Sequence, residues 1–472
     1  MEEKMPRPIT DEEKQYADEL LIRAQAAMKA IEDYDQATVN RLCQAVGWAT
    51  ANEKTFTRLA QMGVDESGLG DREGRPAKRF KIIGILRDAL RQKSMGVIEE
   101  IPERGIVKYA KPVGVIACLV PTTNPALTPP GNGIYALKAK NAIIFAPHPR
   151  SKKTTYETVH AMRTALKKLG APEDIFQCVE KPSIPMSQYL MAICDQTIAT
   201  GGAAMVKAAY SSGKPAYGVG PGNSTILIDE TADIEEAARN TRMSKTSDFG
   251  SGCSADGNLV VEASIYEKLL EQLQKEGGYL ASDEEKKLLA AALWDSEGHR
   301  TIDTIAQPAG TIAKIAGFEI PADRKFIIVK QNNIGKEHLF SSEKLCVVMA
   351  IYQYSGFDTA LEMIKQIYDV GGKGHSCGIY SFNDDHIHQL ALTAPVSRMM
   401  VRQPQSKANA GAFNNGMPMT SSLGCGTWGG NATSENISLK HYMNTTWVSR
   451  PIPEDRPSDA EIFGEFYNTE TF

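Results

Sequence analysis

The feature that most constrains the fold of this chain is an alternation of short apolar runs with amphipathic stretches, which begins at residue 113. The runs are apolar almost throughout, rather than at every second position, and this is typical of strands buried on both faces of a sheet. Helix-like stretches between the runs predict parallel strands with helices on both faces, so the expected fold is α/β with a doubly wound parallel sheet. The expected strands of this first sheet are 113–120, 142–146, 175–179, 197–200 and 224–229.

The rest of the chain extends this pattern. The alternation returns between residues 258 and 420, which is enough chain for a second α/β domain. Helical periodicity covers 11–62 and 78–93, and a Pro-Glu-Arg-Gly turn between two apolar runs predicts a β-hairpin at 97–110. The final stretch is polar with an aromatic-rich end, and it either packs on a neighbouring subunit or is a disordered end.

Composition excludes several classes of protein. A net charge of −5 over 472 residues, with no dense run of lysine and arginine, argues against nucleic-acid binding. No apolar run approaches the roughly 20 residues of a membrane span, and the acidic, polar N-terminus does not resemble a secretory signal. Eight cysteines without a CxxC pair indicate neither a disulfide framework nor a zinc site, so we expect reduced thiols, no bound metal and a cytoplasmic protein.

Cys253 is the strongest candidate for a covalent role. It lies in SKTSDFGSGCSADGN (244–258), among glycines and serines, after a helix that is expected to begin at Asp233. Small neighbours let a substrate approach the sulfur from several sides, whereas a structural cysteine usually has larger apolar neighbours. We therefore expect a nucleophilic thiolate, and the alternative is a small buried thiol.

Strand ends of the first predicted sheet offer further polar groups. Asn124 follows the first strand and opens a helix, where its amide either donates to a developing oxyanion or only caps the helix. Gly201 and Gly202 lie between a strand and a helix, where phosphate oxygens can approach backbone N–H groups. The glycine-rich segment 218–222 precedes a strand, so it does not fit the nucleotide-binding fingerprint.

Two more titratable residues lie at junctions of the second half of the chain. His375, in the glycine-rich VGGKGHSCG segment, is either a base that acts near a thiol or thioester, or a structural histidine. Glu343 precedes a strongly apolar strand, and its carboxylate either holds a ribose diol or is exposed. The sequence leaves both pairs of alternatives open.

Three cations lie in one donor-rich segment, 395–418. Arg398, Arg402 and Lys407 occur there among several amide and hydroxyl side chains. Such a segment suits the anionic head group of a substrate, because charged donors bind anions more strongly than neutral ones. The alternative is that the arginines form structural ion pairs.

Seven motifs occur in an order that resembles one known family. They are PTTNP, IIFAPHPRSKK, GGAAMVKAAYSSGKPAYGVGPGN, SKTSDFGSGC, SEKL, KGHS and LGCGTWGGN. Together they cover about residues 100–450 and resemble the CoA-acylating branch of the aldehyde dehydrogenase superfamily. That branch includes succinate-semialdehyde dehydrogenases and the aldehyde dehydrogenase half of bifunctional aldehyde–alcohol dehydrogenases.

The resemblance implies a domain organisation. A doubly wound cofactor-binding domain would span 1–235, with the hairpin near 97–110 serving oligomerisation. A second α/β domain, the catalytic one with the nucleophilic cysteine, would span 236–420. The segment 421–472 would return to the cofactor domain and end in a small oligomerisation tail, and the protein would be a homodimer or homotetramer.

The resemblance also implies residue roles. Cys253 would form a thiohemiacetal with the aldehyde, and Asn124 and the backbone N–H of Cys253 would donate to its oxyanion. Hydride transfer to NADP or NAD would leave a thioester, which the thiol of coenzyme A would attack with His375 assisting. The implied cofactor-binding residues are Thr122, Pro147, His148, Arg150, Ser151, Gly201, Gly202, Gly220 and Glu343.

Two absences refine this picture. Hydrolytic relatives carry a glutamate that activates water, whereas the corresponding stretch here, YGVGPGN (217–223), has no carboxylate. A thioester without a water base persists until a thiol such as CoA attacks it. NAD enzymes often have a glutamate where this chain has Pro149. His148, Arg150 and Lys152 lie nearby instead, so NADP is permitted and slightly favoured.

The nucleophile segment departs from the family pattern. Relatives commonly read DNGxxCASEQ, whereas this chain reads DFGSGCSADGN, with Phe249 in place of an asparagine. The changed pocket, and a tail similar to that of acylating sulfoacetaldehyde dehydrogenases, favour sulfoacetaldehyde as substrate and sulfoacetyl-CoA as product. Arg398 and Arg402 would then bind the anionic group.

Other functions stay open at this point. The aldehyde could instead be succinate semialdehyde, acetaldehyde or propanal. A hydrolytic aldehyde dehydrogenase would turn over without CoA. A structural, filament-forming protein would keep the fold without catalysis.

Overall fold

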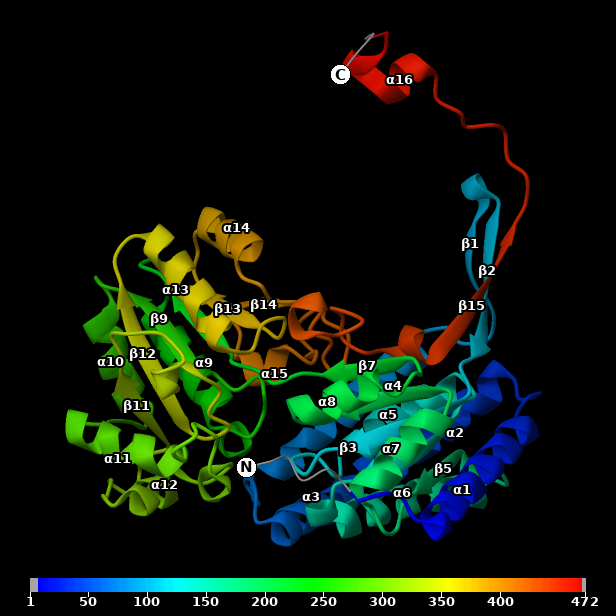
Figure 1. The fold of residues 1–472 in the computed structure, drawn as a ribbon, viewed down its shortest axis with the longest axis horizontal. Helices are drawn as coiled ribbons and strands as arrows, with labels where there is room; N and C mark the ends of the chain where they lie inside the picture. Colours follow the sequence, from blue (N-terminus) through cyan, green and yellow to red (C-terminus); the bar gives the residue numbers. More distant parts are fainter. Residues whose placement is uncertain (1–6, 469–472) are drawn as a thin grey trace.

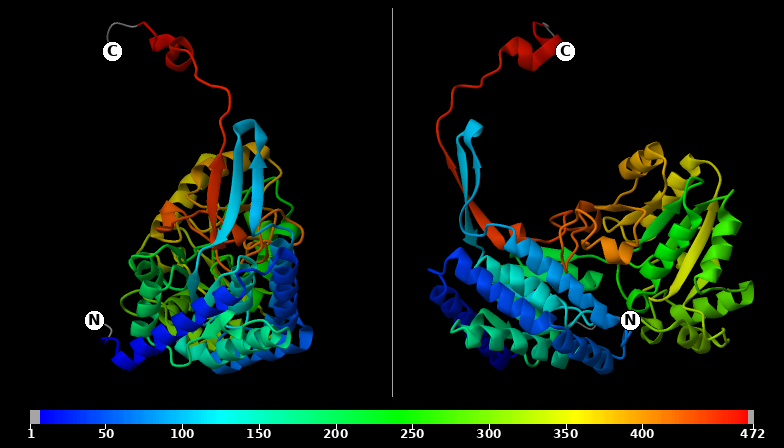
Figure 2. Two further views of the ribbon diagram at one scale, coloured as in Figure 1. Left: turned by 90° about the vertical axis from the view of Figure 1, so that its right-hand side faces the viewer. Right: turned by 180° about the vertical axis from the view of Figure 1, so that it is seen from behind.

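The protein contains two α/β units side by side, and a narrow third sheet rises from one end (Figures 1 and 2). The structure is a computed structural model that describes residues 7–468. It confirms the expected α/β class with parallel sheets. The acidic residues 1–6 lie outside the described residues. Between residues 7 and 468, no helix has both the length and the apolar character needed to cross a membrane.

The first unit is built on a five-stranded parallel sheet in the order β5-β4-β3-β6-β7. β3 is central and every residue of β3 and β4 is buried, as their continuous apolar runs predict. The chain winds outward from β3 to β5 and then back through β6 to β7, so the carboxyl ends of β3, β4 and β6 are neighbours. The strands are β3 (Val115–Val120), β4 (Ala142–Pro147), β5 (Phe176–Cys178), β6 (Gln196–Thr200) and β7 (Ala216–Val219).

Helices cover both faces of this sheet. Because parallel crossovers are right-handed, reversing the winding direction after β5 moves the connecting helices from one face to the other. α5 and α6 lie on the first face with α2 outside them, and α1 and α7 lie on the second. The helices are α1 (Asp11–Ala30), α2 (Gln36–Ala51), α3 (Glu53–Ser67), α4 (Arg79–Leu90), α5 (Thr128–Lys138), α6 (Lys152–Lys168), α7 (Ile184–Ile193) and α8 (Ala203–Tyr210).

The second unit is built on a seven-stranded parallel sheet in the order β10-β11-β12-β9-β8-β13-β14. Its strands are β8 (Thr225–Ile228), β9 (Asn258–Glu262), β10 (Gly278–Leu280), β11 (Phe326–Lys330), β12 (Val348–Tyr354), β13 (Cys377–Tyr380) and β14 (Met399–Val401). Its helices are α9 (Ile234–Lys245), α10 (Tyr266–Lys275), α11 (Asp283–Leu293), α12 (Ala309–Ala316), α13 (Phe357–Val370), α14 (Asp384–Thr393) and α15 (Gln405–Ala408).

One strand belongs to a different sheet from the one expected. The run at 224–229 forms β8 and pairs with β9 and β13 in the second sheet, so its assignment to the first sheet is wrong. The first sheet ends instead with β7. The sequence pattern did not predict this strand, because glycines interrupt its apolar run. Gly218 is needed in that strand, because a Cβ there would lie 2.6 Å from Val206 of the packed helix α8.

The third sheet is antiparallel and has three strands, β1 (Gly96–Ile101), β2 (Ile106–Pro112) and β15 (Met443–Ser449), in that order. The predicted hairpin at 97–110 is confirmed, and its turn ends at Gly105 with a left-handed φ of 62°. Beyond β15 the chain runs away from both α/β units to a short helix, α16 (Asp459–Phe463) (Figures 1 and 2). We call residues 450–468 the C-terminal arm.

Candidate active site

Cys253 lies in a sharply reversed loop between α9 and β9, residues 246–257, which we call the nucleophile loop. Three consecutive residues in it are left-handed, Asp248 and Phe249 with φ of 51° and Gly250 with φ of 70°. A Cβ on Gly250 would lie 2.5 Å from the carbonyl oxygen of Cys346, so this position needs glycine. A phenylalanine in the left-handed region costs about 1 kcal/mol, and Phe249 lies four residues before Cys253.

The structure brings Cys253 and His375 together from segments that are far apart in the chain. Nε2 of His375 lies 3.0 Å from Sγ of Cys253, and its Nδ1 lies 2.8 Å from Oγ of Ser376. His375 is buried just before β13, whereas Cys253 is only partly buried. The preceding Gly374 has φ of 84°, and a Cβ there would lie 1.8 Å from the Cys425 carbonyl oxygen, so glycine sets the approach of the imidazole.

Both partners of this pair are neutral. Burial, with the nearby Glu343 carboxylate, raises the pKa of the Cys253 thiol to about 12. Burial, with the charge of Arg398, lowers the pKa of His375 to about 3. The 3.0 Å contact is therefore a hydrogen bond between a thiol and an imidazole rather than a thiolate–imidazolium ion pair.

Glu343 lines the same small cavity as Cys253. Its Oε1 accepts a hydrogen bond from the Gly222 N–H at 2.9 Å, and burial raises the pKa of its carboxyl to about 7. A Cβ on Gly222 would lie 1.9 Å from the Cys253 carbonyl oxygen, while the Gly220 N–H lies against the Cys425 thiol. Gly222 therefore allows this segment to pack directly on the nucleophile loop.

Asn124 is held by a lysine and does not cap a helix. The following helix, α5, begins at Thr128 and has no side-chain cap, so the expectation that Asn124 opens that helix is wrong. Nζ of Lys78 donates instead to Oδ1 of Asn124 at 2.7 Å. Because an ammonium group has only donors, the amide oxygen must face Lys78 and the amide NH₂ must face away from it.

Asp248 links this amide to the nucleophile loop. Its carboxylate accepts hydrogen bonds from Arg75, from Lys78 at 2.7 Å, from the Asp71 backbone and from Oγ of Ser251, two residues before Cys253. Burial opposes ionisation of the carboxyl, but the charges of Lys78 and Arg75 prevail and lower the pKa of Asp248 to about 2. The sequence pattern did not reveal this network, because its members lie on segments about 170 residues apart.

The carboxyl edge of the five-stranded sheet collects the expected cofactor-binding residues. Oγ1 of Thr122 and Oγ of Ser151 are buried there without a hydrogen-bond partner among the described residues. Gly202 begins α8 with no side-chain cap, and a Cβ there would have nothing within 4 Å. Unpaired donors at strand ends and an open helix N-terminus fit a phosphate-bearing nucleotide. The residues at this edge are Thr122, Pro147, His148, Arg150, Ser151, Gly201 and Gly202.

The two arginines expected to bind the substrate have other contacts. Arg398 is buried, and its Nη1 and Nη2 donate to the backbone carbonyls of His375, Gly424 and Ser434. The guanidinium of Arg402 lies 3.9 Å from the ring centroid of Phe382, an exposed residue just after β13. Arg398 therefore braces the backbone of His375 and Arg402 stacks on an aromatic ring, while the substrate-binding role of both stays a prediction.

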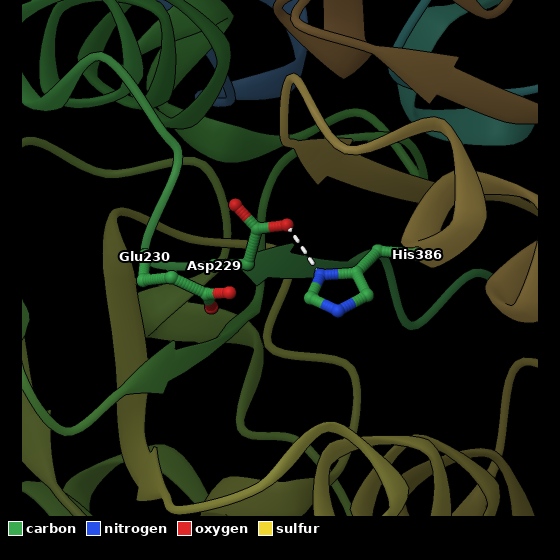
Figure 3. Close-up of side chains that lie close together, drawn as sticks. All are labelled: Asp229, Glu230 and His386. Carbon is green, nitrogen blue, oxygen red and sulfur yellow. Dashed lines mark hydrogen bonds and ion pairs between the residues drawn. The ribbon is translucent and has the colours of Figure 1, made fainter.

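One group of side chains among residues 7–468 has the spacing of a metal site, Asp229, Glu230 and His386 (Figure 3). Nδ1 of His386 lies 2.8 Å from Oδ2 of Asp229, which also accepts a hydrogen bond from Ser381. The other oxygen of Asp229 accepts from both the backbone and the hydroxyl of Thr231. Both carboxylate oxygens are thus already occupied, so a structural hydrogen-bond network joining the ends of β8 and β13 accounts for the group.

Comparison with known proteins places this geometry in context. The model of the aldehyde dehydrogenase family matches residues 7–287. The chain is 44% identical over 449 residues to the sulfoacetaldehyde dehydrogenase of an Acholeplasma species, which covers 94% of this chain and 93% of that protein. It is 37% identical to the sulfoacetaldehyde dehydrogenase (acylating) of Bilophila wadsworthia, over 94% of this chain and 97% of that protein. It is 38% identical to the succinate-semialdehyde dehydrogenase (acetylating) of Clostridium kluyveri, over 94% and 98%.

Solved structures agree with these relatives. An acetylating aldehyde dehydrogenase from Geobacillus thermoglucosidasius superposes with a TM-score of 0.90 at 34% identity, covering 95% of this chain and 99% of that one. A Rhodopseudomonas palustris propionaldehyde dehydrogenase with bound propionyl-CoA gives 0.82 at 26% identity, covering 92% and 94%. An engineered glycolyl-CoA reductase with bound NADP⁺ gives 0.81 at 26% identity, covering 92% and 96%.

Proposed function

Because the chain belongs to the aldehyde dehydrogenase family, as one of its CoA-acylating members, we propose that it converts sulfoacetaldehyde, CoA and NAD(P)⁺ to sulfoacetyl-CoA and NAD(P)H. Two relatives that span almost the whole chain carry sulfoacetaldehyde in their names. Succinate semialdehyde is the alternative substrate, because a relative of similar identity acts on it by name. Both aldehydes bear an anionic group, so both require a cation in the pocket.

The contact between Cys253 and His375 carries the proposal. As Sγ attacks the aldehyde carbon, the thiol proton passes to Nε2 of His375, 3.0 Å away, and the electron pair of the carbonyl moves to its oxygen. Since the thiol and the imidazole are both neutral beforehand, the proton moves during the attack rather than before it. The NH₂ of Asn124 and the backbone N–H of Cys253 donate to the oxyanion, which collapses as hydride leaves the carbon.

A bound oxidised nicotinamide supplies the acceptor for that hydride, and the carbon is left as a thioester on Cys253. His375 gives up its proton to solvent, and the thiol of CoA then attacks the thioester. The CoA thiol proton passes to the departing sulfur of Cys253, and acyl-CoA is released. Among the described residues at 217–223 no side chain is a carboxylate, so this segment offers no base to activate water. Glu343 lies close enough to Cys253 for its charge to raise the pKa of the thiol, and one of its oxygens already accepts the Gly222 N–H.

Nucleotide choice follows from the edge of the first sheet. We expect NADP⁺ to be accepted at least as well as NAD⁺, because Arg150 and Lys152 bring positive charge to this edge and no carboxylate stands at Pro149. Burial and the charge of Arg150 lower the pKa of His148, so its imidazole adds no charge there. The unpaired hydroxyls of Thr122 and Ser151 would hold the nucleotide at the strand ends.

Formation of NAD(P)H from sulfoacetaldehyde, with and without CoA, tests the proposal. We expect turnover only with CoA, sulfoacetyl-CoA as the product identified by mass spectrometry, and loss of at least about 1,000-fold in kcat for Cys253→Ala. Succinate semialdehyde, propanal and acetaldehyde form the comparison panel. Release of free sulfoacetate without CoA, or a higher kcat/KM for the uncharged aldehydes, would contradict it.

A further inference from the structure

A short anionic aldehyde places a strict demand on the site that binds it. In sulfoacetaldehyde the sulfur is bonded to the carbon next to the carbonyl, so the charged group stays within a few ångströms of the reacting carbon. Taking that charge out of water is costly unless a cation meets it. The cation must therefore lie beside the amide that receives the carbonyl oxygen.

Lys78 meets this demand by position. Its Nζ is 2.7 Å from Oδ1 of Asn124, and its side chain remains 24% exposed, so a ligand can reach it. Its second hydrogen bond, to Oδ2 of Asp248, leaves one of the three N–H donors of the ammonium group without a hydrogen-bond partner among the described residues. Arg398 and Arg402 lack this position, because the first is bound to backbone carbonyls and the second stacks on Phe382.

A second lysine adds to the positive charge. Nζ of Lys407 donates to Oγ of Ser247 in the nucleophile loop at 3.0 Å, and the residue is exposed. Burial lowers the pKa of Lys78; Asp248 opposes this effect, and Arg75 and Lys407 add to it. Lys407 is thus close enough to Lys78 for the two charges to repel each other.

Positive charge exceeds negative charge in this neighbourhood. The acids that face these lysines and Lys81 are Asp248, Asp71 and Asp88, and Asp248 already pairs with Arg75. Lys81 lies close by as well, and burial together with the charge of Lys407 lowers the pKa of Lys81 to about 8. An anionic ligand would relieve this repulsion, whereas a neutral one would not.

We propose that Lys78 and Lys407 bind the anionic head group of the aldehyde, a sulfonate or a carboxylate, beside Asn124. The inference rests on the proposed function, since it takes Asn124 as the donor to the carbonyl oxygen. Lys78 acts twice in this arrangement, because it also fixes the orientation of the Asn124 amide. Lys407 acts on the head group alone.

The test compares sulfoacetaldehyde with methylsulfonylacetaldehyde, in which a methyl group replaces the charged oxygen. The readout is the ratio of kcat/KM for the anionic aldehyde to that for the neutral one, because damage to the fold or to catalysis lowers both and cancels. We expect Lys78→Met to lower this ratio by about 100-fold and Lys407→Met by about 10-fold. Lys78→Arg should recover much of it, since the charge is kept.

Two controls separate charge recognition from other effects. Lys365→Met removes an exposed lysine of α13 that pairs with Glu362, and it should leave the ratio unchanged. Raising the ionic strength should raise KM for sulfoacetaldehyde in the wild type more than in Lys407→Met. A ratio within about two-fold of wild type in both lysine variants, or a selective loss in Arg402→Met instead, would overturn the proposal.

Failure of this inference is distinguishable from failure of the proposed function. If the enzyme makes sulfoacetyl-CoA only with CoA present but the lysine variants keep the wild-type ratio, the function stands and the head-group site lies elsewhere. If the wild type itself prefers methylsulfonylacetaldehyde, both the substrate assignment and the head-group site are wrong.

Discussion

The thiol of Cys253 is held in a resting state by its surroundings. A buried thiol beside a carboxylate loses its proton only with difficulty, and its imidazole partner is too weak a base to take that proton in advance. Attack on a carbonyl does not require a free thiolate, because the proton leaves the sulfur while the carbon–sulfur bond forms. Such a cysteine is protected from adventitious electrophiles until an aldehyde occupies the site.

We therefore predict slow alkylation of Cys253 in the ligand-free enzyme. Because the pKa of the Cys253 thiol is raised to about 12, iodoacetamide should modify it at least about 100-fold more slowly at neutral pH than a free cysteine. The alkylation rate should still rise above a pH of about 10. Removing the Glu343 charge in Glu343→Gln should lower the apparent pKa, since a nearby anion disfavours the thiolate.

The measurement is the alkylation rate of the Cys253 peptide by mass spectrometry over a range of pH. Cys253→Ala accounts for modification of the other cysteines, all but Cys178 being buried. A rate that reaches its plateau near neutral pH would reveal a thiolate–imidazolium pair and contradict the neutral assignment.

At the scale of the element, glycines set how closely the loops around the thiol approach one another. Gly222 packs against the Cys253 carbonyl and Gly374 against the Cys425 carbonyl, and in both places a side chain would collide with backbone. Backbone cannot move aside as a flexible side chain can. The distance between Sγ and the imidazole therefore depends on residues that take no part in the chemistry.

Gly374→Ala is the corresponding prediction. A Cβ there would stand 1.8 Å from the Cys425 carbonyl oxygen at a φ of 84°, so we expect a loss of about 2–4 kcal/mol in the free energy of unfolding and at least about 100-fold in kcat. Gly371→Ala is a matched control three residues away, with extended backbone and nothing within 4 Å of its Cβ. Urea unfolding and kcat for both variants are the measurements, and equal behaviour of the two would count against the steric argument.

Local pattern accounts for what the sequence predicted at this scale. The buried strands, the hairpin at 97–110 and the accessible thiol all rest on residues near one another in the chain, where apolar runs and turn residues act directly. The sequence did not predict β7, because Gly218 interrupts its apolar pattern. Close packing of α8 against the strand is the reason for that glycine. The sequence did not predict the network of Lys78, Asn124 and Asp248, because the residues next to a lysine in the chain do not indicate which distant carboxylate it contacts.

At the scale of the whole molecule, the C-terminal arm projects away from both α/β units. Every described residue from 450 to 468 is exposed, including the apolar side chains of Ile452, Ile462 and Phe463. Figure 2 shows the arm and the three-stranded sheet projecting from the same end of the protein. Exposed apolar groups on a projecting segment are typical of a surface covered by another chain, so we propose that the arm packs on a second copy in a homodimer or homotetramer.

Deletion of residues 450–472 tests this proposal. We expect the truncated chain to form a smaller assembly than the full chain, as measured by light scattering after gel filtration, because the apolar side chains of the arm are lost. Ile462→Asp combined with Phe463→Asp should act in the same direction while keeping the chain length. An unchanged molar mass for both variants would exclude the arm as an assembly element.

The Asp248 network also affects how the protein unfolds. Its carboxylate belongs to the second α/β unit, while Arg75 and Lys78, which neutralise it, belong to the first. If either unit loosened alone, a buried charge would lose its partner at a cost of about 3–5 kcal/mol. These ion pairs thereby couple the two units, and we expect both units to unfold in one cooperative transition.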